Sequence, residues 1–564
     1  MRLNSLLTLS FVGTMIFVGC GGGGGGTPIT NPIVSDVNVT ITDDYDYQIE
    51  SLGSANTINA SVSIEGASKS LYLVLSNNDV DETGSATIRH NAKVIPVVQA
   101  KTLLSIDFSE KPIILHAPQY VQDFSSQLGT LVSKIETSQP QVKIMAVPER
   151  MEDIANESTM TFYRSSDNTD PTEATARKVV SDGVKTLNIW VSNDSFGSGC
   201  PKEPTCVTED MVNELANAFL LAGSDNDIYD WVTNIYGEEW SSRAEAKYNY
   251  LIPANDEITI LLTDIDDDGL PSSEEGRVVG FFWGKDNFDK TVFSGSNERV
   301  MFYIDSVMFA NGGSPWSIDD TWPKEIVSTL AHEFQHMIHY YQKNVLRYSN
   351  ITDNTDTWIN EMLSECTEDL VATKIQHIGP RAVDYLDGSA GDPYNIYGRY
   401  PTFNRYNALS LTSWNGLLAD YSKVSAFGAY LVRNYGGAVV LNNIMYNSSI
   451  DEQAVVDAVP GKTFANLLSE WGIAVMLSDH DNLANTPFYN TGDFTYSTYK
   501  DIIYDMGSIN FFNYLPLPTI DTQEGTITVE PQGNYYYKIG ENLTGDINIS
   551  LELNGQTEAT LIAK

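Results

Sequence analysis

Alternating polar and apolar residues mark both ends of the chain as β-rich. Short runs of this kind lie between turns rich in Asn, Asp and Gly, a pattern typical of strands in small β-domains. The clearest runs are 37–41 (VNVTI), 70–75 (SLYLVL), 525–529 (GTITV) and 547–551 (INISL). We therefore predict two separate sandwich-like β-domains, one over residues 35–105 and one over residues 481–564.

The middle of the chain mixes strand patterns with helical ones. Residue runs rich in Ile, Leu, Val, Thr and aromatic residues predict strands at 185–192, 257–263 and 300–304. Apolar residues at helical spacing predict helices over Val121–Ile135 and Asp210–Leu221, and helices dominate to about residue 480. We expect an α+β multidomain protein, with a linker and helical segment at 106–159 and a central domain at 160–480.

One predicted helix of the central domain carries a His-Glu-x-x-His motif. Pro323 suits its first turn. Its apolar stripe consists of Ile326, Leu330, Phe334, Met337, Ile338 and Tyr341. Residues four apart lie on one face of a helix, so His332 and His336 can bind a single Zn²⁺. Glu333, beside them, is placed to accept a proton from a zinc-activated water.

A second motif, Asn-Glu-x-x-Ser-Glu at residues 360–365, supplies a third ligand. A catalytic zinc site of the two-His, one-Glu type keeps its fourth position for water, and Glu361 completes such a set. The polar stretch 350–357 allows the chain to turn between the two predicted helices. Together the two motifs predict a zinc-dependent peptidase.

The second motif resembles the Asn-Glu-x-x-Ser-Asp of the gluzincins, the thermolysin-like peptidases. The resemblance implies that Glu361 binds zinc and that Glu365 orients a zinc histidine by a hydrogen bond. Asn360 is expected beside the metal ligands as well, without binding the metal. We expect Glu368 and Asp369 to form a solvated acidic face. Gluzincins bind the substrate backbone along an edge strand, and residues 300–304 are the candidate by their position in the chain.

A wider resemblance to the hyicolysin family of zinc metallopeptidases rests on three segments. They are 332–343 (HEFQHMIHYYQK), 358–369 (WINEMLSECTED) and 427–436 (FGAYLVRNYG), and looser similarity runs from about residue 160 to the C-terminus. The resemblance implies a thermolysin-like catalytic domain with extracellular, metal-dependent endopeptidase activity on proteins or peptides.

Two rival assignments of the motif region are less favoured. Metzincins need Gly and a third His where this chain has His339 and Gln342. We therefore expect His339 to lie near the site or at the surface without binding metal. The exopeptidase motif Gly-x-Met-Glu-Asn of related aminopeptidases is absent from the sequence, which favours endopeptidase activity.

The tetrahedral oxyanion of peptide hydrolysis needs a donor besides the metal. Tyr421, in Asp420-Tyr421-Ser422-Lys423, resembles the Tyr-x-Lys of related aminopeptidases, whose Tyr has this role. The alternative is a Tyr packed within a helix. Tyr340, Tyr341 and His480 are the next candidates.

The N-terminus predicts a bacterial lipoprotein. An Arg near the start, an apolar run from Leu6 to Val18 and Gly19 before Cys20 match such a signal, so Cys20 is the expected lipidation site. Six consecutive Gly follow, in a tether over residues 21–34. This predicts an extracytoplasmic, membrane-anchored protein, facing the periplasm or the cell surface. A plain secretory signal and a membrane anchor are the alternatives.

Charge and cysteine content narrow the class of partner and compartment. Lys and Arg total 33 against 74 Asp and Glu, a net charge of −41, so nucleic acid is excluded as a partner. Cys200 and Cys206 bracket a short loop and predict a disulfide, which fits an oxidising compartment. Cys366 is expected to be a buried free thiol.

An acidic stretch after the predicted strand at 257–263 has the spacing of an EF-hand calcium loop. Its candidate Ca²⁺ ligands are Asp264, Asp266, Asp268 and Glu275. A strand precedes the stretch, however, and Pro271 stands where an EF-hand has an apolar residue. An acidic hairpin turn is the alternative.

Two function classes remain open from the sequence. The favoured one is an endopeptidase with Zn²⁺, in which Glu333 acts as general base. The alternative is a non-catalytic surface adhesin built on a degenerate peptidase fold. The complete motif set favours the enzyme.

Overall fold

The computed structural model describes residues 32–43, 46–92, 121, 128, 152–165, 168–223, 226–265, 278–377, 398–481, 483, 486–492 and 495–564. The predicted lipoprotein signal with Cys20 and most of the tether lie outside the described residues. The same holds for the helix predicted over 121–135, apart from Val121 and Leu128, which both have helical backbone conformation.

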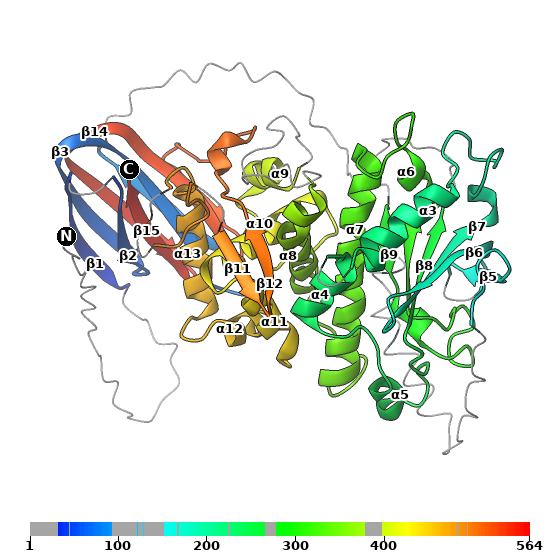
Figure 1. Ribbon diagram of the computed structural model, residues 1–564. Helices are drawn as coiled ribbons and strands as arrows, with labels where there is room; N and C mark the ends of the chain where they lie inside the picture. The colour runs from blue at the N-terminus through cyan, green and yellow to red at the C-terminus, as the bar shows by residue number, and fades with distance from the viewer. Residues whose placement is uncertain are drawn as a thin grey trace, which may run out of the picture.

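The two ends of the chain form one sheet, not two separate β-domains as predicted. Its strand order is β13-β4-β14-β3-β15-β2, with β1 paired to β3. The strands are β1 (Val34–Ile41), β2 (Gln48–Gly53), β3 (Thr57–Asn77), β4 (Gly84–His90), β13 (Gly525–Val529), β14 (Gly533–Asn554) and β15 (Thr557–Ala563). Figure 1 shows blue and red strands interleaved at one end of the molecule. Strand pairing between the two ends therefore makes a single β-domain.

The long strand β3 joins this β-domain to the rest of the molecule. Leu71, Leu73 and Leu75 on one face lie in the core of the β-domain. Tyr72 and Val74 on the other face lie in the larger core of the helical part. Successive side chains of a strand point to opposite faces, so one segment of strand contributes to both cores.

A six-stranded mixed sheet forms the other end of the molecule, in the order β5-β6-β7-β8-β10-β9. The strands are β5 (Thr159–Tyr163), β6 (Pro171–Ser181), β7 (Thr186–Ser192), β8 (Glu257–Thr263), β9 (Gly280–Phe282) and β10 (Met301–Asp305). The segment predicted as the edge strand, 300–304, is the inner strand β10, hydrogen-bonded on both sides to β8 and β9. The strand at this edge of the sheet is instead the short β9.

Helices fill the space between the two sheets (Figure 1). The longest are α7 (Thr321–His339), α8 (Thr357–Ile375) and α10 (Leu418–Asn434), and a π-helical segment, η4 (Tyr340–Arg347), extends α7. The others are α3 (Glu209–Ala216), α4 (Ile228–Tyr236), α5 (Arg243–Lys247), α6 (Ser306–Ala310), α9 (Arg399–Tyr406), α11 (Ala438–Tyr446), α12 (Gln453–Ala458) and α13 (Phe464–Met476). Helix α7 packs against β9 and β10 on one side and α8 on the other.

The boundary predicted at residue 481 also differs from the structure. The hairpin of β11 (Thr495–Tyr499) and β12 (Ile502–Met506) packs against α8 and α11, not against the β-domain. The Tyr504 hydroxyl donates a hydrogen bond of 2.8 Å to the carbonyl of Trp231 in α4. The helical part therefore extends past the hairpin, and the C-terminal contribution to the β-domain begins with β13.

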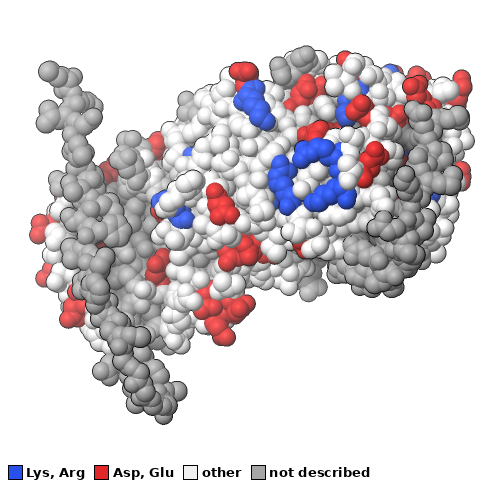
Figure 2. Space-filling view, turned by 90° about the horizontal axis from the view of Figure 1, so that it is seen from below, with Lys and Arg blue, Asp and Glu red and all other residues white. Residues whose placement is uncertain are grey.

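Charge is unevenly distributed over the surface. Figure 2 shows a ring of Lys and Arg side chains near the middle of one face, with acidic side chains scattered around it. The chain as a whole carries a net charge of −41, yet this face has a cluster of positive side chains. Among the described helices, none combines the length and apolar character that a membrane span requires.

Candidate metal centre

The candidate metal centre lies where α7 and α8 face each other. Asn360 of α8 contacts His336 of α7, whereas Glu368, two turns further along α8, contacts Ser328, two turns earlier on α7. The two helices therefore run antiparallel. This arrangement places Glu361 beside both histidines of the first motif.

Three potential ligand atoms converge at this point. Oε2 of Glu361 lies 3.4 Å from Nε2 of His332 and 3.6 Å from Nε2 of His336. In the described part of the chain this is the one group of three or more His, Cys, Asp or Glu side chains arranged to hold a metal ion. Atoms bound to one tetrahedral zinc ion at about 2.0–2.1 Å lie roughly 3.3–3.4 Å apart. The three side chains therefore fit a single zinc ion.

Each imidazole is held at its other nitrogen by a residue of α8. Nδ1 of His332 lies 2.9 Å from Oε1 of Glu368, and Nδ1 of His336 lies 3.2 Å from Oδ1 of Asn360. A hydrogen bond at Nδ1 fixes the ring and leaves Nε2 for a metal. Helix α8 thus supplies one candidate ligand together with supports for the other two.

Glu365 does not contact a histidine of the motif, so the role predicted for it is wrong. Its carboxylate is buried and pairs with Arg399, with Oε1 2.9 Å from Nη2 and 3.0 Å from Nε. Glu368 orients His332 instead. At about 100° per residue, Glu368 projects about 20° from the direction of Glu361, and Glu365 about 40° to the other side.

The predicted solvated acidic face on α8 is also absent from the structure. Glu368 and Asp369 are both buried. Oδ2 of Asp369 accepts a hydrogen bond of 2.8 Å from Arg433 of α10. Helix α8 packs against α7 on one side and α10 on the other, which removes both carboxylates from water.

Glu333 of α7 points toward β9, the edge strand of the sheet. Its Oε2 accepts a hydrogen bond of 2.9 Å from the backbone N–H of Phe282 in β9. Burial raises the pKa of Glu333 to about 7. Burial alone would also raise the pKa of Glu361, but His336 and His332 outweigh it and lower that pKa to about 2. The two carboxyl groups thus differ in their affinity for a proton, because the histidines lie beside Glu361.

A cavity of about 150 Å³ opens beside these groups. Glu333, His336 and Glu361 form part of its wall, so the candidate metal position faces a space for a substrate group. A larger cavity of about 430 Å³ lies next to residues 409–423 and contains none of the three candidate ligands. The smaller cavity is the relevant one because it adjoins the metal-binding geometry.

Tyr421 is buried on α10, close to the site but outside the cavity wall. Its ring centroid lies 4.9 Å from that of Trp414, and the guanidinium carbon of Arg399 lies 5.3 Å from its ring. Burial, and then the charge of Glu361, raise the pKa of Tyr421. Its role as oxyanion donor stays a prediction.

The remaining candidates divide into two groups. Tyr340 and His339 line the cavity, and Nε2 of His339 lies 3.0 Å from the Thr355 hydroxyl. His339 is buried beside the site and is not one of the three converging ligands. Tyr341 and His480 do not line the cavity, which leaves Tyr340 as the better placed of the alternative donors.

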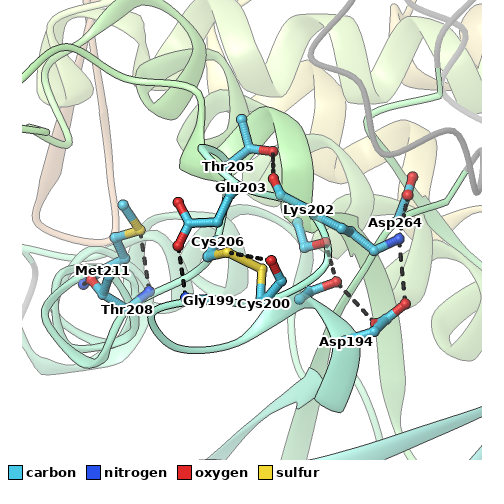
Figure 3. Close-up of a disulfide and its surroundings, with 12 residues drawn as sticks. Asp194, Gly199, Cys200, Lys202, Glu203, Thr205, Cys206, Thr208, Met211 and Asp264 are labelled. Carbon is cyan, nitrogen blue, oxygen red and sulfur yellow. Dashed lines mark hydrogen bonds and ion pairs between the residues drawn. A yellow bond between two sulfur atoms is a disulfide. The ribbon is translucent and has the colours of Figure 1, made fainter.

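The predicted disulfide is present. Cys200 and Cys206 are joined, with their Cα atoms 6.0 Å apart, in the loop before α3 (Figure 3). Cys366 is a buried free thiol, as expected.

The described residues give no support to the calcium loop. The Asp264 carboxylate pairs with Lys202, with 2.5 Å between Oδ2 and Nζ (Figure 3). The positive charge of Lys202 thus neutralises this carboxylate at one oxygen. The other predicted ligands, Asp266, Asp268 and Glu275, lie outside the described residues.

Sequence reasoning missed three groups at the site. Glu368 had a usable signal, since residues seven apart share one face of a helix. The Phe282 N–H and the Arg399 guanidinium had none. They come from a strand and a helix far from both motifs, and only folding brings them to Glu333 and Glu365.

Comparison with known proteins gives the family. A family model described as Peptidase M30 matches residues 167–535. The neutral metalloprotease ShpI of Staphylococcus hyicus is 25% identical over 296 residues, which are 52% of this chain and 55% of that protein. The chain thus spans about half the length of this relative.

Among solved structures, a mutant M1 zinc metallopeptidase of Deinococcus radiodurans, bound to a Tyr-Ser-Ala substrate, gives a TM-score of 0.27 at 11% identity. The match covers 58% of this chain and 62% of that one, and so low a score carries no argument. The match to the family model does identify the family, because it extends over most of the chain and includes both motifs. The resemblance inferred from the motifs is thereby confirmed, and the chain belongs to the peptidase M30 (hyicolysin) family of metallopeptidases.

Proposed function

We propose that this protein is a zinc-dependent endopeptidase of the gluzincin type that hydrolyses peptide bonds within proteins. The observation that carries the proposal is the convergence of His332, His336 and Glu361, whose candidate ligand atoms all lie within 4.8 Å of one another. The name of the neutral metalloprotease relative agrees with a proteolytic reaction. A thermolysin-like layout of the catalytic part belongs to the same proposal, supported by the antiparallel edge strand β9 beside the metal helix.

A bound zinc ion would supply Lewis acidity, polarising the scissile carbonyl and lowering the pKa of the attacking water. Glu333 would accept the proton of that water and later donate it to the leaving amine. The Phe282 N–H holds the Glu333 carboxylate in place. Glu368 and Asn360 hold the two imidazoles so that their Nε2 atoms stay directed at one point.

Metal analysis combined with digestion tests this proposal. The purified full chain should contain one zinc ion and cleave casein, and a zinc chelator should abolish the cleavage. Added Zn²⁺ should restore it. A zinc-loaded protein that cleaves neither casein nor a peptide library would overturn the enzymatic assignment and favour the adhesin alternative.

We also propose that the protein acts outside the cytoplasm, anchored by lipid at Cys20. The signal-like N-terminus supports the anchor, and the Cys200–Cys206 disulfide fits an oxidising compartment. Cys20→Ser should move the protein from the membrane fraction to the soluble extracytoplasmic fraction. Retention of that variant in the membrane fraction would contradict lipidation at Cys20.

A further inference from the structure

His339 lies in the wall of the cavity at the metal centre, and the reaction described above does not use it. It is the last residue of α7, three positions after the candidate ligand His336. It is buried, and it lines the cavity together with Glu333 and Glu361. The imidazole of His339 is therefore within the site, although it is not one of the three converging ligands.

One ring nitrogen of His339 is held by a chain of two hydroxyl groups. Nε2 lies 3.0 Å from the Thr355 hydroxyl, which lies 2.5 Å from the Tyr348 hydroxyl. The Tyr348 hydroxyl is also 3.4 Å from the carbonyl of Ser449, an acceptor that the Lys343 ammonium contacts at 3.0 Å. Tyr348 and Thr355 are both buried, so these contacts are shielded from water.

The lengths of these contacts assign the proton on the imidazole. A phenol has one proton to donate, and the contact of Tyr348 with Thr355 is shorter than its contact with Ser449. The Thr355 hydroxyl then donates its own proton to Nε2 of His339. Burial, and then the charge of Lys343, hold the pKa of His339 well below its usual range, so the ring is neutral. The single N–H of the ring is therefore at Nδ1.

Nδ1 of His339 is available to a ligand in the cavity. Among the described residues it has no hydrogen-bond partner. The amide of Asn344, also in the wall, donates within the protein instead, to the carbonyl of Asp353 at 2.9 Å and to Oδ1 of Asn354 at 2.7 Å. The main-chain acceptors of a peptide are its carbonyl oxygens. An uncharged N–H beside the cavity thus matches a peptide carbonyl.

We propose that His339 is a substrate-binding residue of this site, which donates its Nδ1–H to a carbonyl oxygen of the bound peptide. The proposal rests on the peptidase function proposed above and adds a substrate contact to it. Thr355 and Tyr348 are positioning residues, because they act through the imidazole and fix the nitrogen that carries the proton.

Two amide substitutions at His339 test the contact. The shorter Asn places its amide near the position of Nδ1, whereas Gln places its amide near the position of Nε2, beside Thr355. His339→Gln should therefore lose the substrate contact, and kcat/KM on a peptide that the wild type cleaves should fall about tenfold, the size of one neutral hydrogen bond. The fall in His339→Asn should be no more than about threefold, because a donor remains near Nδ1.

Peptide binding is measured apart from turnover in the Glu333→Gln background, which should keep zinc without cleaving. Adding His339→Gln should raise Kd of the same peptide about tenfold, and adding His339→Asn should raise it at most about threefold. His480→Gln is the control, since His480 lies outside the cavity wall, and it should bind the peptide as the background does. Zinc content should be equal in all of these proteins.

Thr355→Val tests the positioning of the imidazole. Valine has nearly the shape of threonine but cannot donate to Nε2, so the ring proton is no longer fixed at Nδ1. The variant should lower kcat/KM by about threefold. The double variant with His339→Gln should be no weaker than His339→Gln alone, because residues that act through one group are not additive. Additive losses would contradict action through the imidazole.

The outcomes separate this proposal from the function on which it depends. Equal losses in His339→Asn and His339→Gln, or wild-type kcat/KM in His339→Gln, contradict the substrate contact while the peptidase function stands. Loss of zinc from His339→Gln also overturns the proposal, because it would make the side chain a support of the metal. Absence of cleavage in the zinc-loaded wild type contradicts the peptidase function itself.

Discussion

At the scale of single residues, the site depends on what holds each functional side chain. His332 and His336 are fixed at Nδ1 by two different residues of α8, and Glu333 is fixed by a backbone N–H of β9. None of these supports belongs to the His-Glu-x-x-His motif. Substitutions at the supports and at the motif should therefore have separable effects on metal affinity, turnover and stability.

Glu333→Gln should retain zinc and lose proteolysis. The amide is nearly isosteric with the carboxylate but cannot accept the proton of the attacking water. Loss of a general base typically costs about 10²–10⁴ in rate. Zinc content and kcat on a fluorogenic peptide check this, and turnover like that of wild type would remove Glu333 from the mechanism.

Glu368→Ala should lower zinc affinity, whereas Glu365→Ala should lower the stability of the fold. Glu368 supports His332, so its loss should weaken zinc binding by about 10–100-fold. Glu365 neutralises the buried Arg399, so its loss leaves an unpaired charge and should destabilise the fold by roughly 3–5 kcal/mol. Zinc titration and urea unfolding of both variants distinguish the two roles. The reverse pattern would restore Glu365 as the residue that orients the histidine.

Tyr421→Phe should lower kcat by about 10²–10³ if the hydroxyl donates to the oxyanion. KM and zinc content should change little, because that interaction exists only in the transition state. The Phe ring retains the packing against Trp414. Unchanged kcat would assign Tyr421 to the core and direct the search to Tyr340, which lines the cavity.

At the scale of elements, buried polar contacts fix how the helices meet. The Lys343 ammonium of η4 is buried and donates to the carbonyls of Ile444, in α11, and Ser449, at 2.9 and 3.0 Å. It ties the extension of the metal helix to the C-terminal end of α11. These acceptors are neutral, so they stabilise the charged form of the lysine less than a carboxylate would.

Lys343 should make stability rise with pH. Burial, and then the nearby Arg347, lower its pKa from 10.5 to about 7 in the folded chain. The unfolded chain therefore binds more protons between pH 7 and pH 10.5, and folding stability from this group rises with pH across that window. The slope approaches about 1.4 kcal/mol per pH unit.

Lys343→Met removes the titrating group and provides the comparison. Urea midpoints of wild type and variant, measured at pH 7 and pH 9, should diverge in favour of wild type at the higher pH. Parallel shifts of the two proteins between these pH values would contradict the lowered pKa of Lys343.

At the scale of the whole molecule, the two ends of the chain depend on each other. β3 lies between β14 and β15, with which it pairs over most of its length. Its second half also faces the helical core through Tyr72 and Val74. The N-terminal strands are thus an integral part of the fold.

A cut between residues 93 and 151 should therefore leave the two fragments associated. A protease site inserted there, once cleaved, should give two bands on a denaturing gel but a single peak in size-exclusion chromatography. Urea should separate the fragments at the concentration that unfolds the β-domain. Release of the N-terminal fragment in native buffer would contradict the shared sheet.

The sequence by itself determined the parts of this protein that depend on local spacing. The four-residue interval between His332 and His336 and the short loop between Cys200 and Cys206 are such features, because helical periodicity and loop length constrain which atoms can meet. The helix carrying the first motif follows from the same periodicity, whereas the family was indicated by the resemblance of the motif residues themselves.

Only the tertiary structure decided which distant segments meet. Pairing of β3 with β14 joins residues more than 450 positions apart, and the alternation within each strand is the same whichever partner it has. The choice of Glu368 over Glu365 depended on the rotation of α8 against α7 and on Arg399, which comes from another helix. A local pattern gives the faces of an element, and the packing of the whole chain decides what each face contacts.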